Sequence, residues 1–209
     1  MEVLGFALLS VVVVAVPGPS VLFTIGRALT VGRREALLTV AGNAIGVYLQ
    51  VIAVAVGVGV VVERSAAVFT VIKLAGAVYL AYLGVQAIRY RRKVTEALMA
   101  GIPTVLPSRR ALRDGVVVGV TNPKSIVFFV VALPQFTAPA EGSVPVQMLV
   151  LGALFPVTAL VLDSVWAVLA VTARTWFARS PRRLELIGGA GGLMMIGLGA
   201  TIAITGRKE

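Results

Sequence analysis

Six stretches of this 209-residue chain are each long and apolar enough to cross a lipid bilayer as a helix, which takes about 20 residues. The six are Val3–Leu29, Ala36–Val62, Ala66–Ile88, Gly115–Phe136, Val146–Ala173 and Ile187–Ile204. Charged residues make up only 13% of the chain, against about 25% in soluble domains. Because so few charges cannot cover so much apolar surface in water, the sequence predicts a membrane protein. No stretch alternates in polarity as barrel strands do, so we expect helices.

The absence of two residue types excludes several kinds of chemistry. The chain has no Cys and no His, which removes disulfides, thiol redox reactions, imidazole metal sites and histidine acid–base catalysis. A Ser-His-Asp hydrolase is excluded by the same count, and we expect neither a cofactor nor a metal site. The beginning, Met1-Glu2-Val3, lacks a basic segment, so no cleaved signal peptide is expected.

Basic residues are distributed unevenly between the connections, which indicates an orientation. Connections one, three and five hold fourteen of them, against three on the opposite side. The fourteen are Arg27, Arg33, Arg34, Arg89, Arg91, Arg92, Lys93, Arg109, Arg110, Arg113, Arg174, Arg179, Arg182 and Arg183. Because Lys and Arg concentrate in cytoplasmic loops, we expect both termini outside the cytoplasm. The net charge of +10 then reports topology and contact with anionic lipid, not a nucleic-acid partner.

Two halves of the chain share short patterns. Ser20–Phe23 matches Ser125–Phe128 at an offset of 105, and small residues of the third and sixth stretches match at an offset of 113. Three spans per half is an odd number, so the second half enters the membrane from the opposite side. We therefore predict an all-α membrane protein of six transmembrane helices, arranged as two inverted three-helix repeats, as in many secondary transporters. The divisions are residues 1–89, a basic cytoplasmic linker at 90–114, and residues 115–209.

Helix breaks interrupt the first and fourth stretches, at Pro17-Gly18-Pro19 and at Asn122-Pro123. Proline removes a backbone donor, and the freed polar groups cannot face lipid, so they must be buried or line a cavity. The helix that resumes near Ser20 presents free N–H groups, which favour a carboxylate. A single break is best explained as a structural kink, whereas paired breaks in corresponding spans favour a functional role.

Three ionisable residues lie well inside the stretches: Lys73, Lys124 and Asp163. Each needs a partner or a water-filled cavity. Asp163 is the only acid among them, so it is a candidate for binding a coupling proton or cation, with a static counter-ion as the alternative. Lys124 is a candidate for a carboxylate ligand, or else it pairs with the freed carbonyls of the fourth stretch. Lys73 lies nearer the outer surface and is a weaker candidate, as a charge partner that can also snorkel.

Polar residues of the second stretch have two interpretations. Asn43 lies between Gly42 and Gly46, a spacing that lets helices approach closely, so its amide can join helices or bind a ligand. Gln50, near the middle of the stretch, can do either. The pairs Gly115–Gly119 and Gly188–Gly192 repeat the spacing and indicate packing. These seams can lie within one chain or between two, which leaves a homodimer as an alternative.

Three segments together are similar to a known family. They are Val16–Pro19, the run from Lys73 to Gly84, and the run from Gly119 through Asn122-Pro123-Lys124 to Pro134-Gln135-Phe136. In order and over essentially the whole chain, they resemble the lysine exporter family of LysE/RhtB type. Asp163, followed by Trp166, matches an acidic position of that family. The resemblance implies an amino-acid efflux protein of the bacterial plasma membrane, working as a proton antiporter.

One departure from the family bears on the substrate. Some members carry an acid after the second glycine of span two, where this chain has Val47. We therefore expect neutral substrates such as threonine, homoserine or leucine in preference to lysine or arginine.

These interpretations combine into one prediction of the site. The residues predicted to bind substrate are Pro17, Gly18, Pro19, Ser20, Asn43, Gln50, Asn122, Pro123 and Lys124, with Asp163 coupling transport to protons and Lys73 as its charge partner. The alternatives are a transporter of another small solute or cation on the same plan, a channel, a membrane enzyme, and a structural subunit. A single buried carboxylate is poor provision for a cation site and for catalysis.

Overall fold

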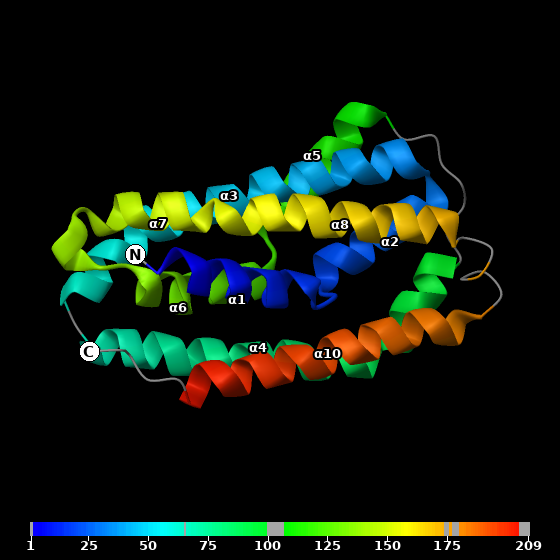
Figure 1. Ribbon diagram of the computed structural model, residues 1–209. Helices are drawn as coiled ribbons and strands as arrows, with labels where there is room; N and C mark the ends of the chain where they lie inside the picture. Colours follow the sequence, from blue (N-terminus) through cyan, green and yellow to red (C-terminus); the bar gives the residue numbers. More distant parts are fainter. Residues whose placement is uncertain (1, 65, 100–106, 174–175, 177–179, 205–209) are drawn as a thin grey trace.

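The computed structural model describes residues 2–64, 66–99, 107–173, 176 and 180–204, and within these ranges it contains helices and no strand, which confirms the all-α prediction (Figure 1). The longer helices are α1 (Val3–Ala15), α2 (Pro19–Thr30), α3 (Arg33–Arg64), α4 (Ala66–Met99), α5 (Ser108–Val120), α6 (Pro123–Val131), α7 (Val144–Gly152), α8 (Leu154–Thr172) and α10 (Pro181–Ile204). Two 3-10 turns, η1 (Leu133–Phe136) and η2 (Pro139–Glu141), lead from α6 to α7.

Both predicted helix breaks are present. The chain bends by 51° between α1 and α2 and by 45° between α5 and the segment Pro123–Phe136. By length and composition, the described residues contain three helices able to cross a membrane, Arg33–Gly57, Val144–Thr172 and Pro181–Thr201, and the two bent pairs raise the number to five. The remaining predicted stretch, Ala66–Ile88, lies within α4.

Helical structure extends into the range predicted as a linker. α4 continues to Met99, well beyond its apolar part, and α5 already begins at Ser108. Arg92 and Glu96 form an ion pair of 3.1 Å one helical turn apart, which supports the polar extension of α4. Gly101 and Pro103, two of the residues that suggested a linker, lie outside the described residues.

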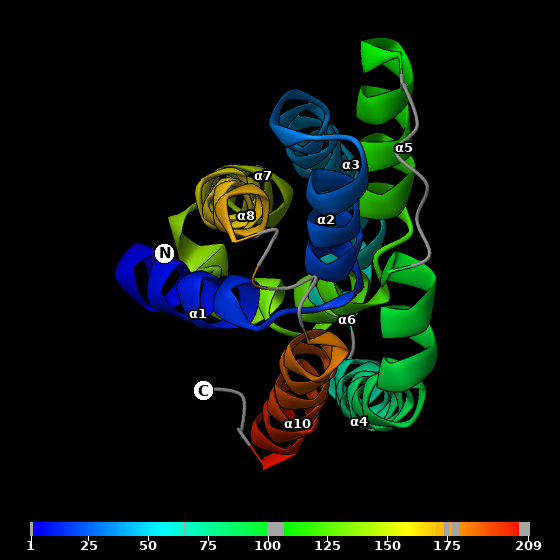
Figure 2. The same cartoon turned by 90° about the vertical axis from the view of Figure 1, so that its right-hand side faces the viewer.

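Two helix pairs frame the structure, as the end-on view shows (Figure 2). α4 runs along α10, and α3 runs along α5, while α8 packs against α1, α2 and α3. The short helix α6 lies between these groups, in contact with both α4 and α3. The two helix breaks, which lie beside α6, are therefore brought together inside the molecule.

Glycine seams permit the close approach of α3 and α5. A Cβ atom placed on Gly42 would lie 2.1 Å from the carbonyl oxygen of Leu112, and one on Gly46 would lie 2.3 Å from that of Val116. Gly115 and Gly119 are packed as tightly against α3, which confirms the packing interpretation. In α10 the prediction holds for Gly192, whose Cβ would lie 2.6 Å from Gly84 O. It is wrong for Gly188, which has only ordinary contact with Arg91.

The distribution of apolar and polar side chains between surface and interior is typical of a protein in lipid. Large apolar side chains face outward on several helices, for example Val56 and Val78, each 70% exposed, and Leu193 at 64%. The interior instead contains charged and amide side chains, among them Lys124 and Asp163 at 3% and 2% exposed. Outward apolar groups gain from contact with acyl chains, whereas the buried polar groups need partners within the protein.

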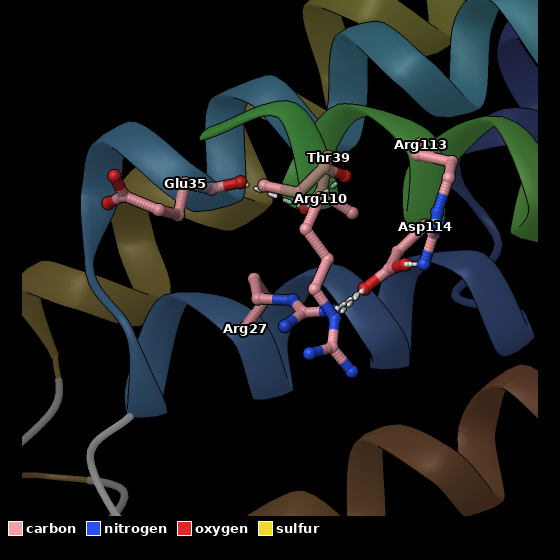
Figure 3. Close-up of polar contacts among 7 residues, drawn as sticks. Arg27, Glu35, Thr39, Arg110, Arg113 and Asp114 are labelled. Carbon is pink, nitrogen blue, oxygen red and sulfur yellow. Dashed lines mark hydrogen bonds and ion pairs between the residues drawn. The ribbon is translucent and has the colours of Figure 1, made fainter. Parts of the chain in front are cut away.

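An ion-pair cluster joins the two broken spans at one end (Figure 3). Arg27, on α2, donates a hydrogen bond of 3.0 Å to the carboxylate of Asp114, on α5. Arg110 and Arg113 lie 3.9 and 3.8 Å from the same carboxylate. Nearby, the hydroxyl of Thr39 donates to the carbonyl of Ala111, 3.3 Å away, which adds a contact between α3 and α5.

We predict that Gly46→Ala lowers stability by about 1–3 kcal/mol, because its methyl group must separate α3 from the backbone of α5. The measurement is thermal unfolding of the purified protein in detergent. Gly57→Ala is the matched control on the same helix, since a Cβ there meets no atom within 4 Å. Equal melting temperatures for the two variants would contradict the packing described here.

Candidate functional site

A small cavity lies where the two breaks meet, among α1, α2, α3, α6 and α8. Its volume is ≈ 10 Å³, about enough for one water molecule. Polar side chains form part of its wall, and apolar ones form the rest. The lining residues are Val14, Ser20, Val21, Asn43, Val47, Asn122, Lys124, Phe155, Ala159 and Asp163.

The ammonium group of Lys124 bonds to the first break. Its Nζ donates to the carbonyl oxygens of Val13, at 3.0 Å, and Val16, at 2.8 Å. Val13 lies one turn before Pro17, which has no N–H to offer that carbonyl. The lysine was expected, in its structural interpretation, to pair with carbonyls of its own broken span. That interpretation is wrong about the partner, because the carbonyls belong to the other broken span.

Gln50 has the corresponding role at the second break. Its Nε2 donates to the carbonyl oxygens of Gly119 and Val120, at 2.8 and 2.9 Å, and lies 3.2 Å from that of Asn122. Gly119 is one turn before Pro123, so its carbonyl also lacks the usual helical donor. Gln50 does not line the small cavity. The structure therefore places it on the backbone of the break.

Asn122 connects the two breaks directly. Its side-chain oxygen accepts from the backbone N–H of Lys124, at 3.1 Å, and so caps α6. Its amide nitrogen donates to the hydroxyl of Ser20 in the first turn of α2, also at 3.1 Å. The first turn of α2 itself has no side-chain cap, because Gly18 precedes it. The hydrogen bond between Asn122 and Ser20 therefore joins the two breaks.

Asp163 and Asn43 face the same cavity with unused acceptors. Asn43 donates from Nδ2 to Oδ2 of Asp163 at 3.2 Å. The other side-chain oxygen of each residue is buried and has no hydrogen-bond partner. Lys124 lines this cavity too, yet the ion pairs within 4 Å among the described residues do not include Lys124 with Asp163. A cation and an anion thus share one cavity without direct neutralisation, which is costly unless a ligand or water bridges them.

The remaining predicted residues divide into two groups. Pro17, Gly18 and Pro19 line a second, larger cavity on the far side of the first break. The side chain of Lys73 lies outside the side chains that the structure describes, so its predicted role stays a prediction. Within the described residues, no group of three or more acidic side chains could hold a metal ion.

Sequence reasoning missed the apolar part of the wall. Phe155, Val14 and Ala159 resemble many lipid-facing residues when they are considered one by one. A usable signal exists in helix periodicity, since Ala159 lies four residues before Asp163 and Val47 lies four residues after Asn43. Residues four apart share a helix face, so each polar residue predicts its neighbour in the wall.

Two broken helices that meet at a buried polar cluster, inside an otherwise apolar helical chain, are an arrangement that many secondary transporters share. Comparison with known proteins agrees. The family model described as LysE type translocator matches residues 11–206. The chain belongs to this family, as its resemblance predicted.

Individual relatives are similar over nearly their whole length. The chain is 35% identical to an "Uncharacterized membrane protein" of Vibrio cholerae, covering 96% of this chain and 95% of the relative. It is 30% identical to the "Homoserine/homoserine lactone efflux protein" of Salmonella typhimurium, with coverages of 90% and 88%. It is 26% identical to the "Leucine efflux protein" of the same organism, with coverages of 93% and 91%. No solved structure matches the chain.

We predict that Gln50→Leu destabilises the protein by about 1–3 kcal/mol, because it removes the side-chain donor of the Val120 carbonyl and one of the donors of the Gly119 carbonyl in a lipid-surrounded interior. Thermal unfolding in detergent measures the effect. Leu49→Ala, at a half-exposed position next along the same helix, is the control and should change stability less. A Gln50→Leu protein as stable as the native one would show that the break needs no side-chain donor.

Proposed function

We propose that this protein exports amino acids across the bacterial plasma membrane in exchange for protons. Six spans would form two inverted repeats of three, with both termini outside the cytoplasm and lipid around the apolar surface. The observation that carries the proposal is the buried cavity with Lys124 on one wall and Asp163 on another, not in direct contact. An α-amino acid carries both complementary charges on one small molecule.

The cavity offers partners for each end of such a substrate. The carboxylate would accept from Lys124 and from the uncapped N–H groups at the start of α2. The ammonium would donate to Oδ1 of Asp163 and to Oδ1 of Asn43, the two buried acceptors without partners. The closed cavity of ≈ 10 Å³ is too small for an amino acid, so the helices would have to separate to admit one. Such opening and closing is the basis of alternating access.

Competition at Asp163 would couple the two fluxes. A carboxylate that has taken up a proton no longer attracts an ammonium group, whereas an ionised carboxylate attracts it strongly. Asp163 would therefore carry either the proton or the substrate, but not both. If Asp163 carries a proton when the site turns inward and an amino acid when it turns outward, the two are exchanged across the membrane.

The cavity wall favours substrates with neutral side chains. Val14, Val21, Val47 and Phe155 surround the charged groups, and none of them could partner a second ammonium or a guanidinium. Val47 occupies the position where some family members carry an acid. The relatives named for homoserine, homoserine lactone and leucine efflux agree with this preference.

The glycine seams give no support to a homodimer. Gly42, Gly46, Gly115 and Gly119 are used within one chain, between α3 and α5. The Gly84–Gly192 contact likewise joins α4 to α10 of the same chain. A monomer is therefore sufficient for the transport cycle proposed here.

We predict that Asp163→Asn abolishes export driven by a pH gradient. The measurement is efflux of radiolabelled leucine and homoserine from proteoliposomes, with and without an imposed gradient. Glu96→Gln is the control, because it removes an exposed carboxylate whose ion pair, within the part of the chain that the structure describes, is with Arg92. Normal gradient-driven export by Asp163→Asn would eliminate Asp163 as the coupling group.

We further predict that Val47→Asp shifts the preference from leucine toward lysine by about tenfold, since a charge-assisted hydrogen bond to the extra ammonium contributes about 1.5–3 kcal/mol. Competition between labelled leucine and unlabelled lysine measures the ratio. Val47→Asn, which has the shape of aspartate but no charge, is the matched control and should leave it unchanged. An unaltered ratio in Val47→Asp would place the substrate side chain elsewhere.

A further inference from the structure

A second, larger cavity lies on the other side of the first break from the charged cavity. It has a volume of ≈ 430 Å³ and lies among α2, α4 and α10. Its lining residues are Pro17, Gly18, Pro19, Leu22, Phe23, Leu83, Gln86, Ala87, Tyr90, Arg91, Thr95, Leu184, Gly188 and Met195. We refer to it as the entry cavity.

A single turn of chain separates the entry cavity from the small charged cavity. Pro17, Gly18 and Pro19 line the entry cavity, and the Lys124 side chain lies against Gly18 from the other side. A Cβ on Gly18 would lie 3.2 Å from Lys124 Nζ and 3.3 Å from its Cε. The hydrogen bonds from Nζ to Val13 and Val16 hold the lysine in this place. Lys124 thus forms part of the partition between the two spaces.

Size distinguishes the two cavities. The entry cavity can contain a whole amino acid, whereas the charged cavity has room for about one water molecule. The structure therefore has room for a substrate on the side of the entry cavity but not at the centre. This side carries the basic end of α4, which the distribution of Lys and Arg assigns to the cytoplasm.

One end of the entry cavity is polar and positively charged. Arg91 uses Nη1 to donate to the carbonyl of Ile88, at 2.9 Å, and its other N–H groups have no partner among the described residues. Gly188 and Gly189 of α10 lie beside this side chain, since a Cβ on either would be in ordinary van der Waals contact with it, at 3.5 and 3.6 Å. A guanidinium with free donors binds a carboxylate well.

Apolar side chains form the rest of the wall. Leu22, Phe23, Leu83, Leu184 and Met195 surround the space between Arg91 and the break. A ligand that fits this arrangement has one anionic group and a short, uncharged body. The substrates proposed above have that form.

We propose that the entry cavity is a second binding site, in which a neutral amino acid is held by Arg91 through its carboxylate before it passes the break and exchanges Arg91 for Lys124. This inference rests on the proposed function, since it takes the substrate class from there. The passage requires Lys124 to leave the carbonyls of Val13 and Val16. The substrate carboxylate is the acceptor that replaces them.

Thiol labelling tests this site without requiring transport, because the native chain contains no Cys. Ala87→Cys places one thiol in the entry cavity, and Arg109→Cys places one on the exposed surface of α5 as a control. Inside-out vesicles are treated with a charged, membrane-impermeant maleimide. We expect leucine to slow labelling of Ala87→Cys and not of Arg109→Cys. Isoamylamine, which keeps the side chain and ammonium of leucine but lacks its carboxylate, should not protect.

The arginine variants complete the test. Arg91→Gln in the Ala87→Cys background should raise the protecting concentration of leucine about tenfold. Arg92→Gln removes the same charge from the neighbouring residue, which pairs with Glu96, and should leave protection unchanged. Arg91→Lys, which keeps the charge, should retain partial protection. Each variant is first checked for a single symmetric peak in size-exclusion chromatography.

Three outcomes would contradict the entry site. The first is that the thiol of Ala87→Cys does not react with the maleimide even without leucine, and the second is that leucine protects the thiol equally well in the Arg91→Gln variant. The third is that labelling changes with the phosphatidylglycerol content of the vesicles but not with leucine. The last would make the cavity a lipid site. If the native protein transports leucine in proteoliposomes but leucine does not protect the thiol, the entry site is wrong and the proposed function stands. If it transports no amino acid, the proposed function fails.

Discussion

Carbonyl groups released by the two helix breaks are the constraint on which the rest of this structure depends. In lipid no water is available to satisfy them, so side chains from other helices must do so. Lys124 of α6 bonds to Val13 and Val16 of α1, while Gln50 of α3 bonds to the end of α5. The two donor groups are chemically different, because one break is satisfied by an ammonium group and the other by an amide. The ammonium group therefore lies against the first break although Lys124 belongs to the second, and the cavity where the two breaks meet contains charges of both signs.

The glycine seams follow from the same constraint. Gln50 reaches the carbonyls of Gly119 and Val120 because α3 and α5 pack almost backbone to backbone, at Gly46 and its neighbours. At the first break, the backbone of α10 approaches equally closely, since a Cβ on Gly191 would lie 2.0 Å from Pro17 O. Small residues thus bring helices close enough for short polar side chains to satisfy the breaks. A larger side chain at Gly46 or Gly191 would separate the helices, and would therefore disturb the polar contacts at the breaks as well as the van der Waals contacts.

Much of the fold could be predicted from the sequence, because hydrophobic length and proline position are local signals. The helical stretches and both breaks follow from them, and the spacing of the glycines marks packing faces on α3 and α5 without saying that the two faces meet. Partners across the molecule could not be predicted, since depth along a helix says nothing about its rotation. Lys124 illustrates this, because its position after Pro123 suggested carbonyls of its own span, whereas rotation directs it to α1. Gln50 appeared equally suited to a ligand or to helix contacts, and only the three carbonyl contacts distinguish them. Phe155 and Val14 had no local signal at all.

The double role of Lys124 limits which molecules can pass under the proposed mechanism. While its ammonium satisfies Val13 and Val16, it blocks the path from the entry cavity and cannot hold a carboxylate fully. When it turns to a substrate, those two carbonyls lose their donor in a region without water. A molecule with only a carboxylate would take Lys124 from these carbonyls and also leave Asp163 without a cation. A zwitterion brings an ammonium group along with its carboxylate, so it supplies a cation and donors to Asp163 and Asn43 while it takes Lys124 from the break. The arrangement therefore favours amino acids over simple carboxylic acids before any contact with the substrate's side chain is considered.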